Sequence, residues 1–155
     1  MTNLSNVIVT AYAALLRALD HVRWLALLLA RLAVGLLFMS TGWGKVHNLV
    51  KVAGFFEHLG IPAPAFNAAL VGYSELICGT LLVVGLLTRF ATVPLAISMI
   101  VAICTAKGSE IHGPFDLVGA DEFTYLVVLI VIAVLGPGSV ALDHFVARRL
   151  PRSSS

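Results

Sequence analysis

Three charged side chains stand out against apolar stretches: Arg31 lies inside the first long apolar run, Lys45 directly follows that run, and Glu75 lies inside the second. An arginine at the centre of a membrane costs about 2.5–3.5 kcal/mol on insertion scales, so such a residue is usually retained for pairing or for function. A carboxylate near two cations can balance their charge, or it can relay a proton to a bound ligand. These residues are the chain's candidates for chemistry.

The composition indicates that these elements are membrane helices. The chain has 155 residues, of which 59% are hydrophobic and 12% are charged, and its mean hydropathy is +0.99. A soluble domain carries about twice that share of charge. One domain is expected at this length. The formal net charge of +2 is explained by membrane topology, so the expected partner is the lipid bilayer and nucleic acid is not implied.

Four apolar runs predict four membrane-spanning helices, which together form an all-α integral membrane four-helix bundle. The runs cover residues 24–44, 66–88, 90–106 and 121–135. A span needs about 20 apolar residues, and the first two runs meet that length. The third is slightly short, and Pro94 is expected in its first turn, where proline is tolerated. The fourth is the shortest.

The two ends flank this bundle, which we place at residues 24–138. Residues 1–23 carry apolar side chains at helical spacing, which predicts an amphipathic helix that either lies at the membrane interface or extends the first span. They do not resemble a cleavable signal peptide. Residues 139–155 follow a Gly-Pro-Gly stop, and Ser139 is expected to cap a short interfacial helix.

The charged residues gather in two groups at opposite ends of the spans. The arginine-rich group comprises Arg17, Arg23, Arg89, Arg148, Arg149 and Arg152, with Asp20 and Asp143. The other group comprises Lys45, Lys51, Lys107, Glu57, Glu110, Asp116, Asp121 and Glu122. Cytoplasmic segments carry an excess of Lys and Arg. Both termini are therefore predicted to be cytoplasmic, in a bacterial inner membrane.

One face of the first span gathers the charged and small residues. The stripe comprises Arg31, Gly35, Phe38, Gly42 and Lys45. Spacings of four and three residues place these positions on one side of a helix. Glycines on such a face let a neighbouring helix approach closely. Gly79 and Gly85 provide matching small positions on the second span, so we expect its Glu75 to face this stripe.

The depth of Glu75 is intermediate between the two cations at about 1.5 Å of rise per residue, so it could engage either of them. Arg31, Lys45 and Glu75 are thus expected to form an interhelical charged network. In one interpretation the network is structural and fixes helix register, with little net stabilisation. In the other it lines a pocket for a quinone headgroup or an organic anion. Secondary candidate residues are Tyr73, Glu122 and Tyr125.

Other kinds of chemistry have little support in the sequence. The loop histidines and acids match no compact metal motif, so no metal site is predicted. Cys78 and Cys104 lie inside spans without a CxxC motif, and packing is a better explanation for them than redox exchange. No nucleophile–base–orienter set is found, so catalysis by this chain alone is not expected.

Three stretches resemble the DoxX family of small bacterial membrane proteins: "RLAVGLLFMSTGWGK", "SELICGTLLVVGLLTR" and "EFTYLVVLIVIAVLGPGSVALD". The resemblance covers about residues 28–143. It implies a four-helix bundle in the cytoplasmic membrane and a link to redox biology, since some members are subunits of a thiosulfate:quinone oxidoreductase. The expected function is a membrane subunit or accessory factor of a redox system. No cofactor is assigned with certainty, but quinone is the candidate cofactor and a redox subunit is the candidate partner. The alternative is a non-enzymatic anchor, assembly protein or small-molecule carrier, and a homo-oligomer is compatible with both.

Overall fold

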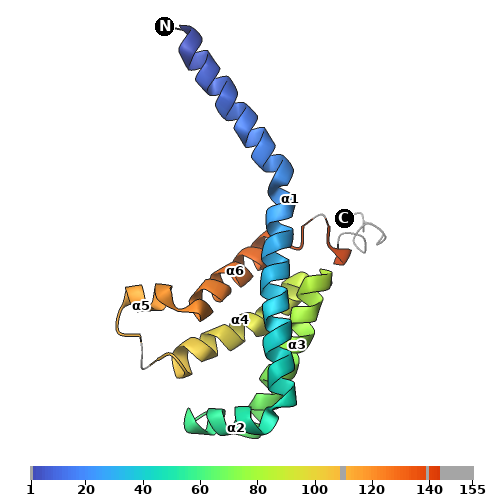
Figure 1. Cartoon of the computed structure of the whole chain (residues 1–155), viewed down its shortest axis with the longest axis vertical. Helices are drawn as coiled ribbons and strands as arrows, with labels where there is room; N and C mark the ends of the chain where they lie inside the picture. Colours follow the sequence, from blue (N-terminus) through green and yellow to red (C-terminus); the bar gives the residue numbers. More distant parts are fainter. Residues whose placement is uncertain (1, 109–110, 139, 144–155) are drawn as a thin grey trace, which may run out of the picture.

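The computed structural model describes residues 2–108, 111–138 and 140–143, with side chains from residue 6 onward. The helices in this part are α1 (Thr2–His47), α2 (Leu49–His58), α3 (Pro64–Val84), α4 (Thr88–Thr105), α5 (Pro114–Gly119) and α6 (Asp121–Leu135). The described residues contain no strand, so the predicted all-α class is confirmed. Helices α1 and α3 run side by side, and α4 lies beside α6 (Figure 1).

Helix α1 is much longer than a membrane is thick. Its 46 residues extend about 69 Å at 1.5 Å per residue, whereas the hydrocarbon core of a bilayer is about 30 Å thick. The first half of α1 projects beyond the other helices (Figure 1). The helix is unbroken through Arg23, so the N-terminal segment is continuous with α1 and is not a separate helix.

The turn between α3 and α4 is set by residues in the left-handed backbone region. Gly85 ends α3 with φ 76° and Leu87 precedes α4 with φ 49°. The second apolar run therefore ends as a helix before residue 88, because glycine readily adopts the left-handed conformation that stops a helix. The placement of Pro94 in a first turn was wrong. Since α4 already begins at Thr88, Pro94 lies inside the helix and removes one backbone hydrogen bond there.

The last helix, α6, has the bounds of the fourth apolar run. Gly136 follows its last residue as the C-cap, with φ 83°. The 15 residues of α6 extend about 22 Å. The segments of the described chain that are long and apolar enough to cross a membrane are Asn6–His47, Pro64–Val84 and Thr88–Thr105. Most of the helix predicted for 139–155 lies outside the described residues.

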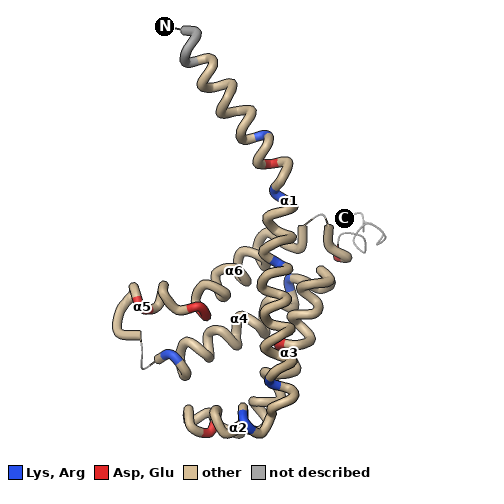
Figure 2. Tube along the Cα trace, in the orientation of Figure 1, with Lys and Arg blue, Asp and Glu red and all other residues tan. Residues whose placement is uncertain are grey.

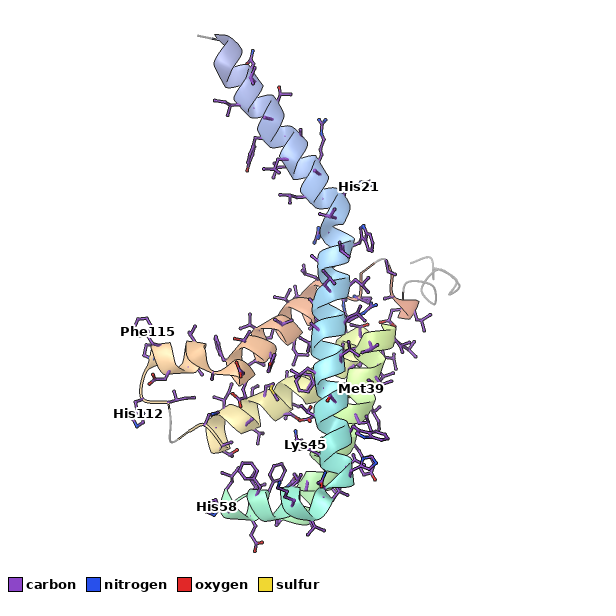
Figure 3. All side chains as sticks on the ribbon, in the orientation of Figure 1. His21, Met39, Lys45, His58, His112 and Phe115 are labelled. Carbon is purple, nitrogen blue, oxygen red and sulfur yellow. The ribbon has the colours of Figure 1, made fainter. Side chains whose placement is uncertain are left out.

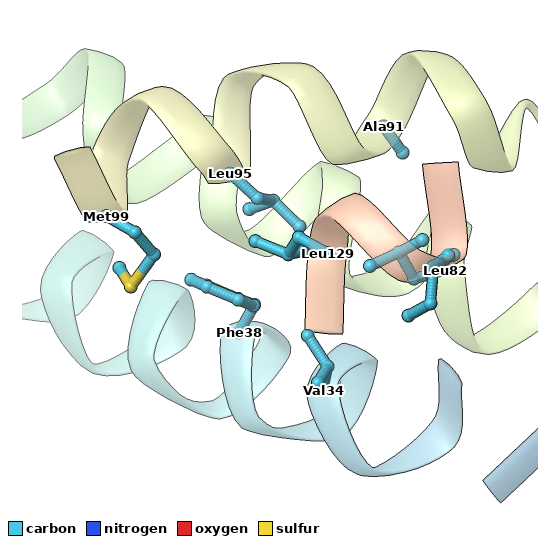
Figure 4. Packing of buried hydrophobic residues seen from close by; sticks show 8 residues of the cluster. Val34, Phe38, Leu82, Ala91, Leu95, Met99 and Leu129 are labelled. Carbon is cyan, nitrogen blue, oxygen red and sulfur yellow. The ribbon is translucent and has the colours of Figure 1, made fainter. Parts of the chain in front are cut away.

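The core lies where the bundle helices meet. It comprises Val34, Phe38, Leu82, Ala91, Leu95, Met99, Leu129 and Ile132 (Figure 4). The opposite faces of these helices expose large apolar side chains such as Leu36, Ile77 and Val134. Charged residues are sparse along the bundle helices (Figure 2). Helices with an apolar core on one side and apolar side chains on the other are suited to lipid rather than water, so this is a membrane protein.

Candidate functional site

Helices α1 and α3 come into contact at glycines. A Cβ atom on Gly79 of α3 would lie 2.5 Å from the backbone nitrogen of Met39 on α1, and one on Gly35 would lie 3.0 Å from the backbone nitrogen of Val83. A Cβ atom on Gly42 would overlap the α3 backbone. Glycine is therefore needed at these positions for the two backbones to approach this closely.

This close contact encloses the carboxylate of Glu75, which is 1% exposed. Both of its oxygens lie 2.5 Å from Nζ of Lys45 on α1. The hydroxyl of Thr41 donates a hydrogen bond to Oε2 at 3.1 Å. Thr41 and Lys45 are four residues apart, so they share one face of α1. That face supplies the charge balance and the hydrogen bonds that a buried carboxylate requires.

The cation of the pair remains accessible, in contrast to its anion. The Lys45 side chain is 30% exposed and lies near the end of α1, above α2 (Figure 3). An ammonium group has three N–H donors and no acceptor. Glu75 presents two oxygens to Lys45, so one N–H donor is left for another oxygen.

Arg31 is buried at a different place in the bundle. It is 2% exposed, and its Nη1 donates a hydrogen bond to the carbonyl oxygen of Pro137 at 2.7 Å. A Cβ atom on Gly85 would lie 2.6 Å from the same nitrogen, so this glycine leaves room for the guanidinium. Arg31 is held by the connection that follows α6 and by the α3–α4 turn.

The three-residue network expected from the sequence is divided between two places. The structure brings Lys45 and Glu75 together, whereas Arg31 bonds to Pro137. Along α1, Arg31 and Lys45 are about 21 Å apart at 1.5 Å per residue. The depth of Arg31 along its helix did not predict its partner. The guanidinium bonds to Pro137, which is 106 residues away in the sequence, and counting residues along the spans cannot identify such a contact.

Two further polar contacts were not anticipated. Thr41 donates a hydrogen bond to Glu75. Its position one helical turn before Lys45 could have predicted that it shares the face that contacts Glu75. The Asp143 carboxylate accepts hydrogen bonds from the backbone nitrogens of Leu87 at 2.7 Å and Thr88 at 2.9 Å. That contact joins residues 55 and 56 positions apart. Asp143 was visible in the sequence as a charge beyond the last span, but nothing local indicated its partner.

Within the described residues, none of the secondary candidates bonds to Lys45 or Glu75. Tyr73 is 48% exposed. The rings of Tyr125 and Phe38 pack in a T-shaped arrangement, with ring centroids 6.4 Å apart. Glu122 stands in the first turn of α6, with its Oε2 buried and without a hydrogen bond. In the described part of the chain, the side-chain partners of Glu75 are Lys45 and Thr41.

The described ranges contain neither a candidate metal site nor a disulfide. No group of three or more His, Cys, Asp or Glu residues there could hold a metal ion. Cys78 is half-buried and packs against the core, while Cys104 is exposed, and both thiols are free.

The fold and this pair define a class: an all-α integral membrane protein with a Lys–Glu ion pair that joins α1 to α3. The DoxX family profile matches residues 26–108, which is more than half of the chain. The chain belongs to the DoxX family.

Curated relatives are similar over most of their length. The "Uncharacterized membrane protein Rv3486" of Mycobacterium tuberculosis is 39% identical over 131 residues, covering 77% of this chain and 80% of that protein. The "Putative oxidoreductase CatD" of Bacillus subtilis is 37% identical over 121 residues, covering 77% and 85%. The "Inner membrane protein YqjF" of Escherichia coli is 25% identical over 122 residues, covering 79% and 92%. No solved structure matches the chain. Together with the apolar helices, these relatives indicate a bacterial inner-membrane protein.

Proposed function

We propose that the chain is a membrane subunit or accessory factor of a quinone-linked redox system, with Lys45, Glu75 and Thr41 as its ligand site. The observation that carries this proposal is the unequal burial of the ion pair. Glu75 is 1% exposed, whereas Lys45 is 30% exposed. A pair with only a register-fixing role has no need of an accessible cation, while a ligand site does. The name of CatD supports a redox setting.

The residues of this site fit a quinone headgroup. The N–H of Lys45 that Glu75 leaves free can donate to a carbonyl oxygen of the ring. A bound quinone supplies two-electron, two-proton chemistry, and a partner redox subunit would deliver the electrons. The Glu75 carboxylate, held by Lys45 and Thr41, could relay one of the two protons, and the second would come from solvent on the exposed side of Lys45. Arg31 lies outside this site.

A structural role is the second candidate, and a specific observation favours it. Glu75 already has two partners on α1, and the glycine contacts press the same two helices together. The pair would then fix the register of α1 on α3 in an anchor or assembly protein. A carrier ranks lower, since apolar Val34 and Phe38 are buried between the levels of Arg31 and Lys45.

Quinone binding separates these two functions. We would titrate the full-length protein in lipid nanodiscs with decylubiquinone, and compare wild type with the double variant Lys45→Gln/Glu75→Gln. Removing both charges leaves no unpaired charge, so the variant should fold. A ligand site predicts at least a tenfold weaker affinity in the variant. The matched control is Lys51→Gln, which removes an exposed lysine of α2 and should bind as wild type does. If wild type shows no binding, or the double variant binds equally well, the structural role is favoured.

The membrane topology is a further part of this proposal. We infer that α6 completes a fourth crossing and that both termini are cytoplasmic. The support is the apolar sequence of α6, its position beside α4 (Figure 1), and the arginines at the end of the bundle where α3 meets α4.

A further inference from the structure

The turn before α4 presents two backbone donors to one carboxylate. The nitrogens of Leu87 and Thr88 bond to Oδ1 and Oδ2 of Asp143, at 2.7 and 2.9 Å. Leu87 has a left-handed backbone, and Thr88 begins the helix. Successive N–H groups in such a turn form a concave site for an anion. The helix N-terminus adds a partial positive charge to it.

Buried polar side chains at this turn are not fully used. Thr88 is completely buried, yet its hydroxyl has no hydrogen-bond partner. Arg31 is 2% exposed, and its Nε also has no partner. The Arg31 guanidinium borders the turn, since a Cβ atom on Gly85 would lie 2.6 Å from its Nη1 and 2.8 Å from the Cβ of Ala141. Arg31 and Asp143 have opposite charges, but the structure shows no ion pair between these two described residues within 4 Å.

Asp143 therefore does not use all of the donors at this turn, because the Thr88 hydroxyl and Nε of the charged Arg31 side chain have no hydrogen-bond partner. We propose that the α3–α4 turn is a carboxylate-binding site and that Asp143 is its tethered occupant. Pro137, which accepts the Arg31 hydrogen bond, and Asp143 both follow α6 in the chain, so both contacts hold this part of the chain against the α1 and α3–α4 side of the bundle. A carboxylate is the matching anion because each of its two oxygens receives one backbone donor. A free carboxylate ligand can replace Asp143 at this site.

Chemical rescue tests the proposal. In full-length Asp143→Ala, we would measure the thermal unfolding temperature in mild detergent, with sodium formate or sodium chloride at equal ionic strength. We expect the variant to unfold several degrees below wild type. Formate should recover at least half of that loss in a saturable manner, and it should have no effect on wild type, where the site is filled. Adding Arg31→Gln to Asp143→Ala should abolish the rescue.

The matched control is Asp116→Ala, because Asp116 on α5 also accepts a backbone hydrogen bond, from His112 at 3.0 Å, but at an exposed position. Formate should not change its unfolding temperature. The proposal is overturned if chloride restores Asp143→Ala as well as formate does, or if Asp143→Ala is as stable as wild type. If Asp143→Ala accumulates poorly, its folded yield after purification in each salt decides. A higher yield in formate supports the site, and equal yields overturn it.

Discussion

Glu75 on α3 and Lys45 on α1 form an ion pair in which the anion is enclosed and the cation is not. Both oxygens of Glu75 lie 2.5 Å from the ammonium nitrogen, but the two side chains are 1% and 30% exposed. Burial of a charge without a partner costs far more than exposure of the same charge. The two members of the pair should therefore respond differently to the loss of the other.

Replacing Lys45 should be the more damaging change. Lys45→Met leaves the buried Glu75 carboxylate without its counter-ion, which should lower the free energy of unfolding by about 3–5 kcal/mol. Glu75→Gln keeps a hydrogen-bond acceptor and leaves Lys45 partly in contact with solvent, so the loss should be about 1–2 kcal/mol. Unfolding titrations in mixed micelles measure both values. Equal losses, or a larger loss in Glu75→Gln, would contradict the unequal burial.

The glycine contact between α1 and α3 should not tolerate a methyl group. A Cβ atom on Gly79 would lie 2.5 Å from the backbone of α1, so Gly79→Ala must push the helices apart. We expect a loss of about 1–3 kcal/mol in unfolding free energy. Gly44→Ala is the control on α1, since nothing lies within 4 Å of its added Cβ. Alanine there should be neutral or stabilise the helix by up to about 1 kcal/mol. Similar losses in both variants would refute this explanation.

Arg31 should affect folding without affecting the Lys45–Glu75 site. Arg31→Gln loses the charged hydrogen bond to Pro137, which should cost about 1.5–3 kcal/mol. Quinone affinity should change by less than about twofold, because Arg31 lies about 21 Å from Lys45 along α1. Parallel unfolding and binding titrations check this. A tenfold loss of affinity in a folded Arg31→Gln protein would mean that the three charges act as one network after all.

The orientation in the membrane can be tested with reporter fusions at the C-terminus. With arginines concentrated at the end of the bundle that holds Arg89, the positive-inside rule places the terminus in the cytoplasm. A green fluorescent protein fusion should be fluorescent, and an alkaline phosphatase fusion should be inactive. The reverse pattern would mean an odd number of crossings or an inverted bundle.

Helix positions could be predicted from the sequence because they depend on local features. The apolar run at 121–135 became α6 with the same bounds. The second run was predicted to reach residue 88, but α3 ends at Val84, four residues earlier. The helix stops there because Gly85 has a left-handed backbone conformation, which composition does not reveal. Pro94 was misplaced for a related reason, since α4 starts earlier than the apolar run suggested.

The candidate site could be predicted only in part. Glu75 was identified as a charge inside an apolar run, and helical spacing placed Lys45, directly after the first run, on a face with glycines. The partner of Arg31 was not predictable, because the contact with Pro137 joins positions 106 residues apart. The same holds for Asp143, whose acceptor role depends on how the chain folds back after α6. Long-range pairing of this kind leaves no periodic signal in one sequence.

The proposed function requires that Lys45 and Glu75 bind a quinone. The most direct measurement is native mass spectrometry of the full-length protein, extracted from its own membrane in mild detergent, alongside Lys45→Gln/Glu75→Gln prepared identically. We expect wild type to carry an added mass that matches the membrane quinone, and the folded double variant to lack it. Wild type without that mass after quinone is added back, or equal retention in both proteins, would contradict the claim.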